Sequence, residues 1–180
     1  MSDARSENSA GEAASPASRL ARTRMGQRLS GFIYGTIIAL SVIVAGARAY
    51  PHSAGHIAAL VAVTCTVFWI AHVYAHGLGH SAAQQEHMTL EELLEIARRE
   101  GSIVEAALLP VAALLLGAAG IVSTHLAVWL AFALGLVFLG AQGIVFARVE
   151  RLSPLATAFV IIANLSLGLI LVALKLVLTH

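Results

Sequence analysis

The chain has 180 residues, of which 58% are hydrophobic and 12% are charged, and its mean hydropathy is +0.83. Soluble domains carry about 25% charged residues, so this composition excludes a cytosolic enzyme, a secreted disulfide-rich domain and a nucleic-acid-binding module. The formal net charge of +1 is too close to balance to indicate an acidic partner. The single cysteine, Cys65, excludes an intrachain disulfide.

The first 28 residues differ in composition from the rest of the chain. Residues 1–18 are rich in Ser, Ala, Asp and Glu. Four arginines then lead into the first apolar stretch: Arg19, Arg22, Arg24 and Arg28. So few apolar residues cannot bury a core, which predicts a disordered cytoplasmic tail over residues 1–28 that ends in a basic anchor. The acidic residues and the lack of a clear cleavage site favour an uncleaved first span over a signal peptide.

Long apolar stretches predict five membrane-spanning helices, because a helix needs roughly 20 apolar residues to cross about 30 Å of hydrocarbon. Polar residues and turn-forming residues interrupt these stretches and mark the approximate ends of the spans. The predicted spans cover residues 31–47, 56–77, 103–122, 126–147 and 155–178. The sequence therefore predicts an all-α, polytopic bundle of five transmembrane helices whose two termini lie on opposite sides of the membrane.

The arginines determine the predicted orientation, because Arg and Lys are retained on the cytoplasmic side of a membrane. With the N-terminus inside, the cytoplasmic segments hold the four anchor arginines and four more: Arg98, Arg99, Arg148 and Arg151. The outer side then holds only Arg48 and Lys175. This asymmetry predicts an N-in, C-out topology. The Ala-rich composition and the absence of an organelle signal favour a multi-pass protein of the bacterial inner membrane.

The longest polar segment between two predicted spans precedes the third span. Thr89 followed by Glu92 is a capping-box pattern. Apolar residues then repeat at helical spacing: Leu90, Leu93, Leu94 and Ala97. These patterns predict an amphipathic helix over residues 89–100 that lies on the cytoplasmic membrane surface. Ser102 with Glu105 is a second capping box, which predicts the start of the third span.

Polar side chains inside the predicted spans are the candidate site residues. Such a side chain costs several kcal/mol in lipid unless it is paired or faces a cavity. The candidates at or within the spans are Arg28, Tyr34, His72, Gln142 and Asn164. We interpret them as an interhelical hydrogen-bond network that fixes helix packing, in which each contact contributes about 0.6 kcal/mol.

Three histidines lie on one face at the end of the second span. His72, His76 and His80 are spaced four residues apart, and two His at i and i+4 can bind one metal ion. Glu105 is expected at a similar depth and would be a further ligand. This set predicts either a metal or proton site or, alternatively, interfacial histidines together with a glutamate that caps its own helix. No other cofactor is expected.

Glycines in the predicted spans indicate where helices approach one another closely. Gly31 and Gly35 form a G-x-x-x-G pair in the first span, and Gly135, Gly140 and Gly143 lie along the fourth. Such small residues let two helix backbones come into contact, either within one bundle or between subunits. The pattern leaves both arrangements open.

Three local patterns resemble the endolysosomal and prokaryotic lysosomal-type potassium channel family. They are Arg28, Phe32 and Gly35 in the first span, Phe68-Trp69-Ile70-Ala71-His72 in the second, and Ala107-Leu108-Leu109-Pro110 in the third. The family has Ser-Asp where this chain has Ile33-Tyr34, and its repeat has six spans. The resemblance implies a homo-oligomer in which the first helix of each subunit lines a pore. Ile37 and Leu40 would then face the pore.

The sequence narrows the function to three classes. It contains no nucleophile–base pair, no phosphate-binding loop and no paired intramembrane carboxylates, so we expect no enzymatic activity. The first expectation is an oligomeric, cation-permeable, channel-like protein whose pore forms between subunits. The alternatives are a metal or proton handling protein built on the histidines, and a non-catalytic scaffold. The scaffold would recruit a cytoplasmic partner through its basic tail or the helix over residues 89–100.

Overall fold

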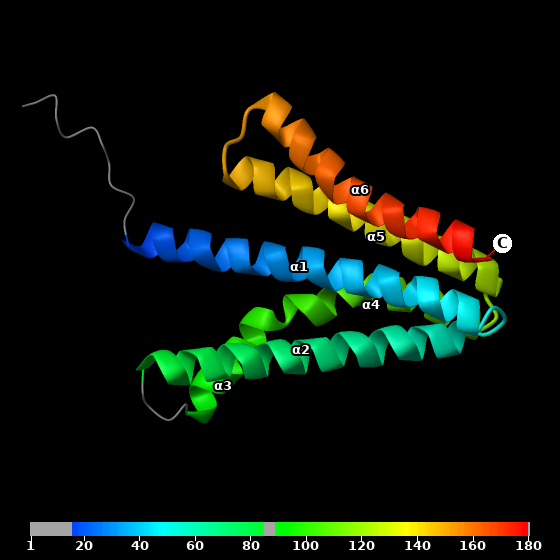
Figure 1. Ribbon diagram of the computed structural model, residues 1–180, viewed down its shortest axis with the longest axis horizontal. Coiled ribbons are helices and arrows are strands. Elements are labelled where there is room, and N and C mark those ends of the chain that lie inside the picture. Colours follow the sequence, from blue (N-terminus) through cyan, green and yellow to red (C-terminus); the bar gives the residue numbers. More distant parts are fainter. Residues whose placement is uncertain (1–15, 85–88, 180) are drawn as a thin grey trace, which may run out of the picture.

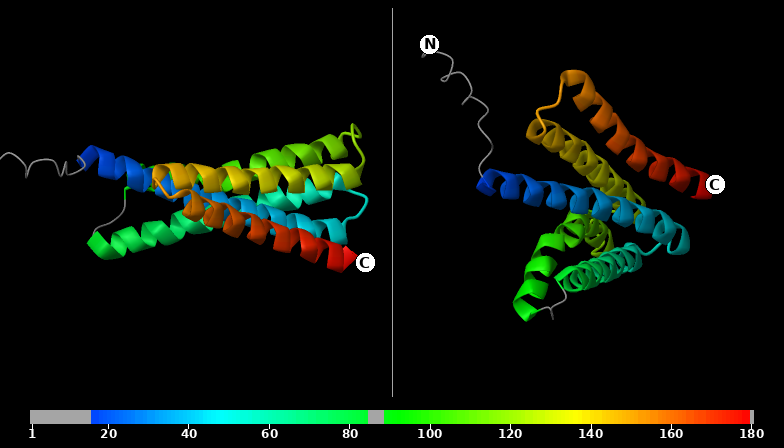
Figure 2. Two further views of the ribbon diagram at one scale, coloured as in Figure 1. Left: turned by 90° about the horizontal axis from the view of Figure 1, so that it is seen from above. Right: turned by 60° about the vertical axis from the view of Figure 1, so that its left-hand side comes forward.

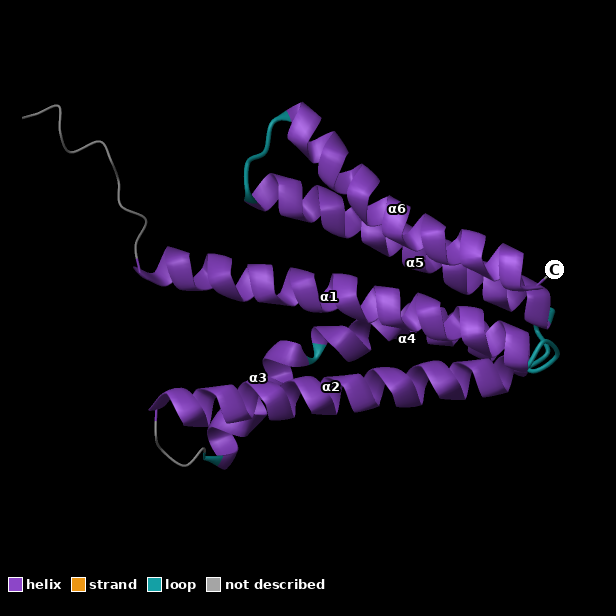
Figure 3. Cartoon of the chain, in the orientation of Figure 1, coloured by secondary structure: helices purple, strands orange, loops and turns teal. Residues whose placement is uncertain are grey.

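The computed structural model describes residues 16–84 and 89–179, which form six α-helices and no strand (Figures 1 and 3). The helices are α1 (Pro16–Ala49), α2 (Ala54–Gln84), α3 (Leu90–Glu100), α4 (Ser102–Ala118), α5 (Thr124–Val149) and α6 (Pro154–Thr179). The all-α class predicted from the sequence is confirmed for this part of the chain.

Four helices contain a stretch that is long and apolar enough to cross a membrane. These stretches are Met25–Ala49, Ala54–Gly79, Thr124–Val149 and Pro154–Leu174. A fifth spanning unit results if α3 and α4, which are bent by 44° at their junction, are counted as one. Each predicted span falls on one helix, and the four to five apolar helices indicate a membrane protein.

The N-terminal helix begins earlier than the sequence indicates. Residues 16–28 are the first turns of α1, so the predicted disordered tail over residues 1–28 is wrong for this part. Pro16 occupies the first helical position, where its fixed φ is favourable, and the Ala, Leu and Arg residues that follow are good helix formers. Residues 1–15 of the predicted tail lie outside the described residues.

Two helix ends also differ from the predicted spans. The second helix continues to Gln84 rather than ending at residue 77. The third predicted span runs four residues too far, because α4 ends at Ala118. Gly120 has a φ of +76°, and the backbone N–H groups of Gly120 and Ile121 donate to the carbonyls of Gly117 and Leu116. This is the Schellman arrangement that ends helices at a left-handed glycine.

The chain passes back and forth along the bundle, so that α1, α4 and α6 run in one direction and α2 and α5 in the other (Figures 1 and 2). The loops after α1 and α4 and the end of α6 lie at one end, beside Arg48. The other end holds the start of α1, the end of α2, all of α3 and the α5–α6 loop. We call it the arginine-rich end, because it carries Arg28, Arg98, Arg99, Arg148 and Arg151.

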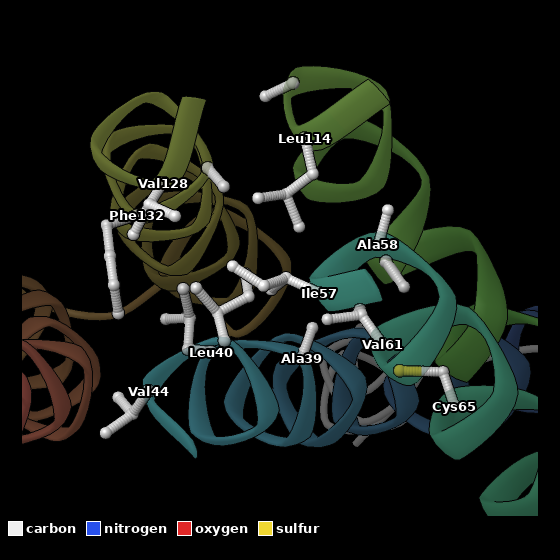
Figure 4. Packing of buried hydrophobic residues seen from close by; sticks show 14 of the residues in the cluster. Ala39, Leu40, Val44, Ile57, Ala58, Val61, Cys65, Leu114, Val128 and Phe132 are labelled. Carbon is white, nitrogen blue, oxygen red and sulfur yellow. The ribbon is translucent and has the colours of Figure 1, made fainter. Parts of the chain in front are cut away.

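The first helix lies in the middle of the bundle and contacts every other helix. In its most apolar 18-residue window 56% of the residues are buried, against 6% in the corresponding window of α6. Large apolar side chains fill the centre (Figure 4), and those with almost no exposed surface include Leu40, Ile43, Ile57, Leu114 and Phe132. Because lipid is as apolar as this core, close van der Waals packing rather than water exclusion holds the helices together.

The G-x-x-x-G pair forms the contact between α1 and α4. A Cβ on Gly35 would lie 2.5 Å from the carbonyl oxygen of Ile103, and one on Gly31 would lie 2.1 Å from Oγ of Ser102. Only glycine permits this approach. The sequence left open whether the pair serves the bundle or a subunit interface, and in the structure it packs within the bundle.

The predicted amphipathic helix is present as α3, and its N-terminal capping box is confirmed. The backbone N–H of Glu92 donates to Oγ1 of Thr89, and the backbone N–H of Thr89 donates to the Glu92 carboxylate. The second predicted capping box is wrong. Gly101, with helical dihedral angles (φ −56°, ψ −22°), is the N-cap residue of α4 and Ser102 is its first residue, and no side chain makes a capping hydrogen bond there.

Candidate functional site

Charged side chains from four helices meet at the arginine-rich end, and we call this group the polar cluster. Its members are Arg28 of α1, His76 of α2, Glu95, Arg98, Arg99 and Glu100 of α3, and Glu105 of α4. The helices converge here because α4 follows α3 directly and the two glycines of α1 bring α4 close. The cluster therefore depends on the same packing that forms the bundle.

An ion pair connects Arg28 of α1 with Glu105 in the first turn of α4 within the cluster. Nη2 of Arg28 donates to Oε2 of Glu105 at 2.9 Å, across 77 positions of sequence. Arg28 lies one turn before Gly31, and Glu105 lies one turn after Ser102, so the glycine contact aligns the two charges. Their side chains are 56% and 44% exposed, so the pair contributes at most about 1 kcal/mol to stability.

Two contacts attach α3 to α2. Nε1 of Trp69 donates to the backbone carbonyl of Ala97 at 2.9 Å. Nδ1 of His76 lies 3.0 Å from Oε1 of Glu100, whose side chain is only 16% exposed, and the contact is an ion pair when the histidine is protonated. Both contacts fix the C-terminal part of α3, since Ala97 and Glu100 are three residues apart near its end.

Aromatic rings continue the cluster toward the bundle. The ring of Tyr34 on α1 lies 5.1 Å from that of His72 on α2, centroid to centroid, and His72 lies 6.2 Å from His76. Nδ1 of His72 lies 3.2 Å from the carbonyl of Phe68 in its own helix. Tyr34 and His72, both predicted to stabilise packing, are therefore joined by ring contact rather than by a hydrogen bond between helices.

Two of the described members of the proposed metal set are paired with other side chains. Glu105 pairs with Arg28 and His76 pairs with Glu100, while the side chain of His80 lies outside the described residues. Among the residues that the structure describes, no group of three His, Cys, Asp or Glu side chains has the arrangement that a metal ion requires. In this arrangement His76 faces the carboxylate of Glu100, and His72 faces the ring of Tyr34.

The remaining network candidates, Gln142 of α5 and Asn164 of α6, lie outside the cluster. Nδ2 of Asn164 makes a long bond of 3.4 Å to the carbonyl of Leu139. Gly143 lets α6 approach, since a Cβ there would lie 3.2 Å from Cα of Ile161. Oε1 of Gln142 is buried, with no hydrogen-bond partner in the described chain. The single predicted network is thus two separate groups of residues.

The two expected pore-lining residues are packed inside the bundle. Leu40 has no exposed surface, and a Cβ on Gly135 would lie 2.6 Å from its Cδ2. Ile37 packs against the same buried core. Leu40 could line a pore between subunits only if α1 exchanged its present neighbours, whereas Ile37 is only partly buried.

Three adjoining clefts open on the polar cluster, with volumes of about 270 to 330 Å³, and Gln27 lines all of them. The first is lined mainly by arginine, and the other two by histidine and Glu100. Charges of both signs at exposed positions suit the binding of a charged group. Sequence reasoning missed Gln27, Glu95 and Glu100. The His76–Glu100 contact could have been expected from the helical hairpin, because His76, eight residues before the end of α2, and Glu100, ten residues after the start of α3, lie at similar distances from the connection between the two helices.

Comparisons of the chain with protein families, curated proteins and solved structures find no match. The resemblance to lysosomal-type potassium channels therefore stays a prediction that rests on the three local patterns.

Proposed function

We propose that this chain is a non-catalytic, five-span protein of the bacterial inner membrane that presents α3 to a cytoplasmic protein partner. The observation that carries the proposal is that α3 is attached to the bundle by specific contacts but is not buried in it. The helix is fixed by its capping box and by the Trp69–Ala97 and His76–Glu100 contacts. Yet α3, described over its full length, has no buried residue.

Apolar side chains on the outer surface of α3 support this proposal. Leu90 is 71% exposed and Leu94 is 48% exposed, one helical turn apart, and Glu91 is exposed beside them. Exposed apolar residues on a rigidly held helix are typical of a surface that binds another helix or a groove. A helix that served only to connect α2 and α4 would need no such residues.

The apolar centre of the bundle favours this function over permeation through a single chain. Leu40, Ile43 and Phe132 fill the space between the helices, and the hydroxyl of the buried Thr36 donates to the carbonyl of Phe32 in its own helix. Cation permeation through a homo-oligomer stays a prediction. It requires an interface other than the Gly31–Gly35 pair, which α4 already covers.

The placement of arginine at one end of the bundle supports an N-in, C-out orientation. Single cysteines in a Cys65→Ala background test it, one at His52 in the α1–α2 loop and one at Glu150 after α5. Both positions are exposed. A membrane-impermeant maleimide added to intact cells should label the first and not the second. The reverse labelling would overturn the orientation.

Photocrosslinking tests the proposed binding surface. A photoreactive amino acid replaces Leu94 on α3 in cells, and the matched control replaces Ile162, which is 64% exposed on α6. We expect a protein adduct of discrete mass at Leu94 and lipid adducts at Ile162. Lipid adducts alone at both positions would show that α3 lies in the membrane surface without a protein partner.

A flux assay separates this function from the channel-like one. Potassium and proton flux is measured in liposomes that contain the purified chain, with empty liposomes and an ionophore as controls. We expect no flux above that of empty liposomes. Selective flux would overturn the proposed function and would make an oligomeric pore the better explanation.

A further inference from the structure

We propose that the cleft between α1 and α3 binds the phosphate of an anionic phospholipid headgroup. The cleft has a volume of about 270 Å³ and is lined by Gln27, Arg28, Glu95, Arg98 and Arg99. Three guanidinium groups and one amide thus surround it, against one carboxylate. Arginine is the side chain best suited to phosphate, because its planar guanidinium presents paired N–H donors to two oxygens.

The fold holds these arginines in place and leaves their positive charges available to bind another anion. Arg98 and Arg99 occupy the last turn of α3, where the helix dipole favours cations. Arg28 pairs with Glu105 and Arg99 pairs with Glu95, but the four side chains are 44% to 56% exposed. Such exposed pairs are weak and exchange readily for another anion. Arg98 has no ion-pair partner among the side chains that the structure describes.

The position of the cleft indicates a lipid as the source of the phosphate. The apolar stretch of α1 begins at Met25, so Gln27 and Arg28 lie in its first turn, at the level where headgroups meet the hydrocarbon. With the proposed N-in orientation this is the cytoplasmic leaflet, whose anionic lipids attract clustered arginines. The site is distinct from the exposed leucines of α3, so it does not depend on a protein partner.

The test measures lipid binding to the full chain, purified in a neutral detergent. Thermal unfolding is followed with added phosphatidylglycerol, phosphatidylcholine or inorganic phosphate, and bound lipid is counted by native mass spectrometry. We expect phosphatidylglycerol to raise the unfolding temperature and to be retained in the spectrum. Equal effects of the two lipids would overturn the proposal, and so would an equal effect of inorganic phosphate, which would assign the cleft to a free anion.

Substitutions locate the site. Arg98→Gln combined with Arg99→Gln should weaken phosphatidylglycerol binding about 25-fold, or about fivefold per arginine. Arg148→Gln is the matched control, because Arg148 is exposed at the same end of the bundle but on α5. Equal weakening by the control would show general surface attraction and overturn the site. If the double variant fails to fold, the lipid comparison with the unaltered chain still decides the question.

Discussion

Replacing Gly35 with alanine tests whether the close contact between α1 and α4 organises the arginine-rich end. The added Cβ would lie 2.5 Å from the carbonyl oxygen of Ile103 and 2.8 Å from its Cα. Ordinary contact begins at 3.4 Å, so the backbone of α4 would have to move by about 0.9 Å. Backbone atoms cannot relieve this clash by a change of rotamer, as a side chain can. We therefore expect the free energy of unfolding to fall by about 1–3 kcal/mol, the usual cost of overpacking.

The matched control is Gly26→Ala, since no described atom lies within 4 Å of the Cβ that it adds to the same helix. Alanine is the better helix former, so this variant should be up to about 1 kcal/mol more stable than the parent chain. Both free energies are measured by titration with dodecyl sulfate in mixed micelles, followed by circular dichroism. If Gly35→Ala proves as stable as Gly26→Ala, the close packing of α1 on α4 is refuted.

Three further substitutions test individual contacts. Ser102→Ala should raise the unfolding free energy by about 1 kcal/mol, because the buried Oγ has no partner within the described chain; a loss in the same titration would contradict this. Arg151→Gly should add about 1 kcal/mol, because Arg151 has a φ of 51° at the end of α5, where glycine avoids steric cost; an unchanged thermal midpoint would argue against strain there. Trp69→Phe removes the bond to the Ala97 carbonyl and should speed amide hydrogen exchange in α3 about 2- to 10-fold. Trp129→Phe should leave exchange in α3 unchanged, and equal effects of the two tryptophan variants would mean that the bond does not hold α3.

The helical elements were predictable because their signals are local. Length and hydropathy located the long helices, and the Thr89–Glu92 pattern located the start of α3, because a capping box requires only residues three apart. The end of α4 was misplaced for a related reason. Hydropathy continues through Ile121 and Val122, whereas the chain turns at Gly120, whose left-handed conformation ends the helix whatever the polarity of its neighbours.

The polar cluster was only partly predictable, because its pairs join distant parts of the chain. The sequence placed Glu105 at a depth similar to that of the histidines, but depth does not specify which faces of the helices meet. The partner of Glu105 depends on the contact between Gly35 and Ile103, which rotates α4 so that its first turn faces Arg28. Leu40 was assigned to a pore by resemblance, yet its side chain fits against Gly135, a contact between residues 95 positions apart.

The bend at Gly101 leaves α4 shorter than its neighbours, and this has a consequence for the surrounding bilayer. Its 17 residues span about 26 Å, less than the roughly 30 Å of a typical hydrocarbon layer. Leu108, Leu109, Leu115 and Leu116 leave an exposed apolar surface on this short helix. Lipids beside α4 must thin locally to match it, at a fraction of a kcal/mol for each ångström of hydrophobic mismatch. The protein should therefore partition toward thinner membranes and be more stable in lipids with shorter acyl chains.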